Sequence, residues 1–218
     1  MIEEFDLVIF DCDGVIADSE VLACQALADV LADYGLPLGL EGVFDAFLGR
    51  GFAAVEYYYR VTAGEPVPAP LRAALTERIT DLFRGSLKPV PDVGTVLRSL
   101  TLPFCLASSS EPWRIALTLR TLALADLFGS RVYTASQVRR GKPAPDLFLL
   151  AAERMTVRAG RCLVIEDTVP GVTAGKAAGM TVWGFVGGSH CVGRDVGRKL
   201  RAAGADRVFD RMADFFEA

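Results

Sequence analysis

Five short apolar runs, separated by stretches of helical periodicity, restrict the possible folds more than any other feature of the sequence. The first, "DLVIFD" (6–11), is rich in β-branched and aromatic residues and too short for a helix, so it predicts a buried strand. The pattern returns at 103–110, 131–136, 161–167 and 180–186, with helical periodicity between the runs at 93–100, 113–124, 145–155 and 171–179. Alternating strands and helices predict βαβ units, and hence an α/β fold with a Rossmann-like parallel sheet covered on both faces.

The stretch from 19 to 87 interrupts this alternation. "SEVLACQALADVLADYG" (19–35) carries apolar residues at helical spacing and ends at a glycine. Two more helical segments, over 43–61 and 70–87, follow with no strand run between them. We therefore expect an α-helical cap domain over 19–87, inserted into a core domain that consists of 1–18 and 88–218.

The composition argues against a nucleic-acid or membrane partner. A length of 218 residues suits one sizeable domain, or a core domain with a smaller insert, and 51% hydrophobic with 23% charged residues is an ordinary globular balance. The net charge of -4 offers no basic surplus for a nucleic acid. We see neither a signal peptide nor an apolar run of the roughly 20 residues that a membrane span needs. Five scattered cysteines with a single histidine predict buried, reduced thiols and no structural zinc, so we expect a cytoplasmic protein.

Polar side chains collect where the predicted strands end. Asp11 and Asp13 follow the first strand, a run of serines (108–110) the second, and Glu166 with Asp167 the fourth, while the third is followed by "RRGKPAPD" (139–146). Ligands of open parallel sheets bind at the carboxyl ends of the strands, so we expect these side chains at one edge.

Such a set is suited to phosphoryl transfer. One carboxylate can attack phosphorus and form an acyl-phosphate, and a second can protonate the leaving oxygen and then deprotonate the attacking water. Crowded carboxylates need a cation, and Mg²⁺ suits them because it is hard and prefers oxygen ligands. A serine hydroxyl, loop amides and a lysine can hold the remaining phosphate oxygens. Asp11 and Asp13 alone would fit a turn equally well; it is the four strand ends together that favour chemistry.

"DCDGV" (11–15), "LASSS" (106–110), "GKPAPD" (141–146) and "IEDTVPGV" (165–172), in this order, resemble the four motifs of the haloacid dehalogenase superfamily. The chain is similar to its phosphatase branch, with an α-helical cap after the first strand, and to β-phosphoglucomutase-like and sugar-phosphate phosphatases. The resemblance covers nearly the whole chain.

For the acidic residues, the resemblance implies the following roles. Asp11 would be the nucleophile and a Mg²⁺ ligand. Asp13 would be the general acid/base, and its backbone carbonyl would also bind the metal. Asp167 would ligate Mg²⁺, and Glu166 would be either a ligand or a partner of the ligands.

For the phosphate, the resemblance implies that the Ser108 hydroxyl and the Ser109 amide donate hydrogen bonds, while Lys142 neutralises phosphate and nucleophile together. The serine usual after the second acid pair is Thr168, which keeps a hydroxyl. We expect Ser110 to cap the helix that follows it.

The four motifs assign no role to two further polar residues, Arg50 and His190. Arg50, between glycines in "LGRGF", either reaches a substrate carboxylate or hydroxyl or faces solvent, and we include it as a substrate-binding candidate. His190, the single histidine, stands in a loop with no partner motif nearby, so we interpret it as structural or exposed.

The leading hypothesis is a Mg²⁺-dependent phosphatase that hydrolyses a small phosphorylated metabolite, a sugar or sugar-acid phosphate, through an aspartyl-phosphate on Asp11, and that could act as a monomer. Asp13 disfavours a dehalogenase, since a halide needs no proton on leaving. The absence of lysine from residues 1–87 disfavours phosphonate hydrolysis by the resemblance. A β-phosphoglucomutase-like phosphosugar mutase and a non-catalytic binding member of the fold are the alternatives.

Overall fold

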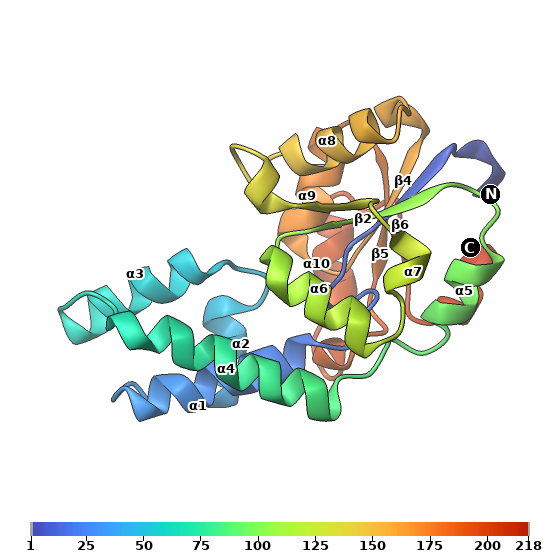
Figure 1. Cartoon of the computed structure of the whole chain (residues 1–218). Coiled ribbons are helices and arrows are strands. Elements are labelled where there is room, and N and C mark those ends of the chain that lie inside the picture. The colour runs from blue at the N-terminus through green and yellow to red at the C-terminus, as the bar shows by residue number, and fades with distance from the viewer. Residues whose placement is uncertain (1, 218) are drawn as a thin grey trace. The chain divides into compact units, whose positions relative to one another are not determined.

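The chain folds into two compact units, which are described separately. In the computed structural model, which describes residues 2–217, one unit contains the chain up to Asp18 and again from Lys88 onward. The other unit is Ser19–Leu87. Figure 1 shows both units along the chain. No helix among residues 2–217 is long and apolar enough to cross a membrane.

The first unit is built on a six-stranded sheet in the order β3-β2-β1-β4-β5-β6, and every neighbouring pair is parallel. The strands are β1 (Leu7–Phe10), β2 (Phe104–Ser108), β3 (Val132–Thr134), β4 (Cys162–Glu166), β5 (Thr181–Phe185) and β6 (Arg207–Phe209). The five strands predicted from the sequence are all present, and the α/β fold is confirmed. The sequence did not predict β6, because this edge strand has only three residues and begins with an exposed arginine.

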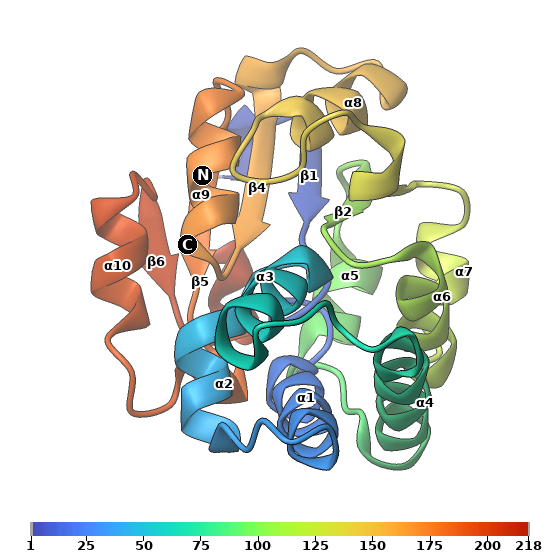
Figure 2. The same ribbon diagram turned by 90° about the vertical axis from the view of Figure 1, so that its left-hand side faces the viewer.

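Helices cover both faces of the sheet (Figure 2). They are α5 (Val93–Ser99), α6 (Pro112–Thr121), α7 (Ala125–Phe128), α8 (Asp146–Arg154), α9 (Val169–Ala177) and α10 (Val196–Ala202), with short 3-10 turns at Ile2–Glu4, Ala135–Gln137, Ala159–Arg161, Ser189–Cys191 and Met212–Phe216. Successive side chains of β1 point to opposite faces. Val8 and Phe10 join the core formed with α5, α6 and α7, whereas Leu7 and Ile9 join the core formed with α8, α9 and α10. Burial on both faces explains the uninterrupted apolar runs.

The second unit is entirely helical in its regular structure. Its helices are α1 (Glu20–Asp33), α2 (Gly39–Phe47), α3 (Phe52–Ala63) and α4 (Ala69–Ser86). The sequence suggested one helical segment over 43–61, but the structure divides it at 48–51, where Gly49 has a φ of 70°. Leu27, Leu31, Val43 and Leu71 belong to this unit's own hydrophobic core.

Within the first unit, the chain segments next to the boundary pair with each other. The Asp18 N–H donates to the Lys88 carbonyl at 3.0 Å, and the Val90 N–H donates to the Ile16 carbonyl at 3.0 Å. These bonds hold the segment before Ser19 beside the segment that follows Leu87. All five cysteines of the chain are buried as free thiols.

Candidate active site

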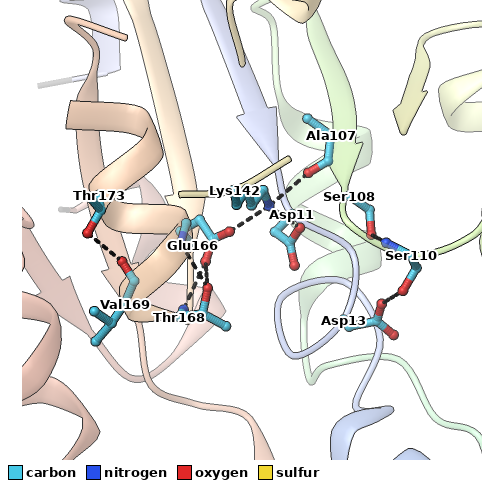
Figure 3. A network of polar contacts seen from close by, with 11 residues as sticks. Asp11, Asp13, Ala107, Ser108, Ser110, Lys142, Glu166, Thr168, Val169 and Thr173 are labelled. Atoms are coloured by element: carbon cyan, nitrogen blue, oxygen red, sulfur yellow. Dashed lines mark hydrogen bonds and ion pairs between the residues drawn. The ribbon is translucent and has the colours of Figure 1, made fainter. Parts of the chain in front are cut away.

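Sheet order brings three of the predicted strand ends together. β1 lies between β2 and β4, with Phe10 level with Leu106 on one side and Ile165 on the other. The residues that follow these positions therefore emerge at one edge of the sheet. Figure 3 shows Asp11, Ser108 and Glu166 at this edge, within the first unit.

Lys142 joins these strand ends. Its Nζ donates to Oδ1 of Asp11 at 2.6 Å, to Oε1 of Glu166 at 2.6 Å and to the carbonyl of Ala107 at 3.1 Å (Figure 3). The lysine side chain is only 5% exposed, and Nζ lies 4.9 Å from the centroid of the Phe148 ring. All three ammonium hydrogens thus have protein acceptors, and the lysine has a fixed place.

The charges around Lys142 are unequal. Burial raises the pKa of Asp11 well above its usual value, Lys142 opposes this rise, and Glu166 and Asp167 add to it. Burial by itself would lower the pKa of Lys142, but Asp11 and Glu166 outweigh it and raise that pKa. Two buried carboxyl groups, Asp11 and Glu166, therefore share one ammonium, with Asp167 nearby as a third acid, and a further cation would stabilise the ionised forms.

Glu166 is held at both carboxylate oxygens. While Oε1 accepts from Lys142, Oε2 accepts from the Thr168 amide at 2.8 Å and from its hydroxyl at 2.9 Å. The Thr168 Oγ1 in turn accepts from the Gly171 N–H at 3.1 Å and caps α9. A Cβ at Gly171 would overlap Oε1 of Glu166, so this turn of α9 needs glycine for close approach.

Asp167 has a different environment. It is 2% exposed; its Oδ1 has no hydrogen-bond partner among the described residues, and its Oδ2 lies 3.0 Å from Nε2 of His190. Burial raises its pKa, with His190 acting in the opposite direction. A Cβ at Gly14 would lie 1.9 Å from Oδ2 of Asp167, and Gly14 has a φ of 78°. Glycine at this position therefore lets the β1 loop pass directly beside Asp167.

His190 contacts Asp167, which the sequence analysis did not anticipate. The imidazole is 1% exposed, and its Nε2 lies 3.0 Å from Oδ2 of Asp167 and 3.2 Å from the Cys191 sulfur. Burial alone would lower the pKa of His190, but the contacts with Asp167 and Cys191 raise it to about 11. Of the two alternatives from the sequence, structural or exposed, burial rules out the exposed one, and the partner was not foreseen because it comes from a different strand end.

Asp13 faces the loop after β2. Its Oδ2 accepts from the Ser110 hydroxyl at 2.5 Å, and its Oδ1 accepts from Nη2 of Arg114 at 2.8 Å. The prediction that Ser110 caps the next helix was wrong. The N-cap of α6 is Glu111, directly before Pro112, and the Ser110 hydroxyl bonds a carboxylate instead. Arg114, in the first turn of α6, was missed because no motif marks it.

The remaining predicted residues differ in their settings. Ser108 is buried, and its Oγ accepts from the Ser110 N–H at 3.0 Å, which leaves the hydroxyl hydrogen free to be donated elsewhere. Ser109 is exposed. Arg50 belongs to the second unit, where it is exposed between α2 and α3.

Metal-binding potential rests on few side chains. In the described part of the chain, no group of three or more His, Cys, Asp or Glu side chains is arranged to hold a metal ion. The predicted Mg²⁺ ligands include only two side-chain carboxylates, Asp11 and Asp167, together with the backbone carbonyl of Asp13. Two side-chain carboxylates are fewer than the three side chains that define such a group, so the predicted ligand set is compatible with this finding.

Comparison with known proteins gives a consistent picture. The family model of the haloacid dehalogenase-like hydrolases matches residues 5–179. The chain is 29% identical to the 6-phosphogluconate phosphatase of Escherichia coli (strain K12), over 85% of this chain and 84% of that protein. It is 32% identical to the fructose-1-phosphate phosphatase YqaB of the same organism, over 83% of this chain and 96% of that protein.

Solved structures agree with the sequence relatives. A conserved haloacid dehalogenase-like protein from Agrobacterium tumefaciens str. C58 superposes with a TM-score of 0.84 at 34% identity, covering 98% of this chain and 96% of that one. A family hydrolase from Deinococcus radiodurans R1, with bound phosphate and sodium, has a TM-score of 0.77 at 36% identity, covering 97% and 93%. The chain therefore belongs to the haloacid dehalogenase-like hydrolase family, as a phosphoric monoester hydrolase.

Proposed function

We propose that the protein is a Mg²⁺-dependent phosphatase that hydrolyses a sugar phosphate or sugar-acid phosphate through an aspartyl-phosphate on Asp11. The observation that carries the proposal is the contact of Lys142 with both Asp11 and Glu166, at 2.6 Å each, at the edge where Ser108 and Asp167 also lie. We assign the attack to Oδ2 of Asp11, because Oδ1 accepts from Lys142.

The residues present fit a magnesium ion. Oδ1 of Asp167 is buried without a hydrogen bond from any described residue, and a hard cation with a preference for oxygen would satisfy it. Asp11, Asp167 and the carbonyl of Asp13 would hold the ion. Glu166 has protein partners at both oxygens, so its role is to orient Lys142 and not to bind the metal. When bound, Mg²⁺ supplies positive charge that offsets the carboxylates and the substrate phosphate.

In the first step, Oδ2 of Asp11 attacks phosphorus as the bond from phosphorus to the sugar oxygen breaks. The bonding electron pair goes to that oxygen, and Asp13, as a carboxylic acid, gives it a proton. The products are the free sugar hydroxyl and an acyl phosphate on Oδ2 of Asp11. Lys142, the Ser108 hydroxyl and the Ser109 amide offset charge on the transferring phosphoryl group.

In the second step, Asp13 is a carboxylate and takes a proton from water as the water oxygen attacks phosphorus. The bond from phosphorus to Asp11 breaks, and its electron pair restores the Asp11 carboxylate. Inorganic phosphate leaves, and Asp13 has regained its proton. Asp13 is thus acid and base in turn.

Substrate selection is assigned to the helical unit of 19–87, as a cap domain, with Arg50 as a contact for a substrate carboxylate or hydroxyl. The names of two relatives, a 6-phosphogluconate phosphatase and a fructose-1-phosphate phosphatase, support a phosphorylated sugar or sugar acid as substrate.

The test is a panel of phosphorylated sugars and sugar acids, including 6-phosphogluconate and fructose 1-phosphate, with phosphate release measured in Mg²⁺ and in EDTA. We expect release from at least one substrate in Mg²⁺ only, and none from Asp11→Asn. Asp126→Asn, an exposed aspartate in α7, is the matched control and should behave like the wild type. Activity in Asp11→Asn, or an isomerised sugar phosphate without phosphate release, would contradict the proposal.

A further inference from the structure

Asp13 is anchored by groups from α6 and the loop before it. Arg114 donates to one carboxylate oxygen and Ser110 to the other, and the side chains of Arg114 and Asp13 are 17% and 9% exposed. Figure 3 shows the Asp13 carboxylate next to Ser110, with Asp11 between this pair and Glu166. The two acids of the β1 loop therefore have separate sets of partners.

The supports of this anchor are rigid. Ile115 and Leu119 fix α6 in the hydrophobic core beside the sheet, so the first turn that carries Arg114 has a defined position. The Ser110 N–H donates to Oγ of Ser108 at 3.0 Å. Asp13, in contrast, follows β1 in an irregular loop in which the Gly14 N–H donates to the Ala17 carbonyl. The two bonds to the Asp13 carboxylate therefore come from α6 and from the loop before it.

We propose that Arg114 is a positioning residue that holds the Asp13 carboxyl group in the orientation needed for proton transfer. The inference rests on the proposed function, in which Asp13 is the acid/base. A guanidinium can only donate, so Arg114 keeps Oδ1 as an acceptor in both halves of the reaction. The Ser110 hydroxyl can donate or accept, and it therefore suits Oδ2 with or without a proton.

This division assigns a separate task to each oxygen of Asp13. Oδ1 is the fixed point, and Oδ2 carries the proton that passes to the sugar oxygen. Loss of Arg114 would free the side chain to rotate about its own bonds, and small misplacements of a catalytic group can lower rates by as much as about 10²-fold. Binding of substrate would change less, because Arg114 acts through Asp13.

The experiment is a double-mutant cycle in the full-length protein. Arg114→Ala is combined with Asp13→Asn, and kcat and KM are measured by phosphate release with 6-phosphogluconate and fructose 1-phosphate. We expect Arg114→Ala to lower kcat by about tenfold or more with KM changed less than about twofold. In the Asp13→Asn background, the same substitution should have no further effect, because its target is already disabled.

Two more variants test the explanation. Arg114→Lys keeps a cation and should recover part of the lost kcat; it also serves if Arg114→Ala does not fold. Arg120→Ala is the matched control, since this arginine of α6 is exposed and bonds the Ala116 carbonyl of its own helix. It should leave kcat unchanged.

Equal effects of Arg114→Ala in the two backgrounds, or an effect on KM alone, would overturn the inference and leave the proposed function standing. Absence of phosphate release from the wild-type protein would overturn both.

Discussion

Asp11 and Asp13 are separated by one residue, yet the protein gives them opposite surroundings. Their side chains are equally buried, at 8% and 9% exposure, so burial does not distinguish them. Asp11 shares Lys142 with Glu166, and the nearby charge of Asp167 raises its pKa further. Asp13, in contrast, accepts hydrogen bonds from Arg114 and from the Ser110 hydroxyl. The difference is one of charge balance: carboxylates outnumber cations around Asp11, whereas Asp13 is paired with one arginine.

This contrast separates two requirements of phosphoryl transfer. The nucleophile must lie where the phosphate is neutralised, so it belongs beside Lys142 and a cation site. The acid/base must exchange a proton with the leaving group, so it needs orientation more than further charge. In the proposed mechanism, the ends of β1, β2 and β4 meet the first requirement, and α6 with the loop before it meets the second.

The largest expected effect on stability and activity comes from removing Lys142, the cation that Asp11 and Glu166 share. Lys142→Met leaves Asp11 and Glu166 buried without their shared cation, which we expect to lower stability by about 3–5 kcal/mol. Phosphate release should fall by about 10³-fold, since the same ammonium offsets charge on the phosphoryl group. Urea unfolding and kcat measure the two effects.

The matched control is Lys176→Met. Lys176 is paired with Asp206 at 2.7 Å, but the two side chains are 35% and 41% exposed. Exposed pairs contribute little, so we expect a change of no more than about 1 kcal/mol and unchanged kcat. Equal destabilisation by the two substitutions would contradict the central place given to Lys142.

Removing the acid/base should have a smaller effect, which depends on the leaving group. Asp13→Asn keeps the shape of the side chain but has no proton to give, so we expect hydrolysis of sugar phosphates to fall by about 10²-fold. Formation of the aspartyl-phosphate from p-nitrophenyl phosphate should fall much less, because nitrophenolate leaves without a proton. Rapid-quench measurement of the first turnover compares the two substrates. An equal loss with both would show that Asp13 is not the acid.

The sequence predicts the candidate site best where its residues stand at strand ends. Apolar runs predicted five strands, and because parallel strands end at one edge, the acids of β1 and β4 could be expected to meet. The structure places Asp11 and Glu166 on the same lysine, as this logic requires. Their roles in catalysis stay predictions.

The same logic could not find contacts made by helices and loops. Arg114 reaches Asp13 only because α6 begins at Pro112 and turns its first residues toward the β1 loop, and His190 meets Asp167 through the loop after β5. Neither contact has a short spacing in the chain. β6 and α10 were also missed, because each is short and carries charged residues.

The smallest expected effect concerns the support of Glu166 on the Asp11 side. Thr168→Val removes the hydroxyl that donates to Oε2 of Glu166 and caps α9, and loss of such a cap costs about 0.5–2 kcal/mol. Thr168→Ser keeps both bonds and should match the wild type within about 0.5 kcal/mol. Thr173→Val, also in α9, is the control: its exposed hydroxyl donates only to the Val169 carbonyl (Figure 3).

We expect Thr168→Val to lower kcat only severalfold, because Glu166 keeps its contact with Lys142 and its bond to the Thr168 amide. Urea unfolding and phosphate release on the three variants give the comparison. A loss of activity as large as that of Lys142→Met would mean that the Thr168 hydroxyl acts on the phosphate itself. A loss confined to stability would instead mean that the Thr168 hydroxyl only supports Glu166, the partner of Lys142.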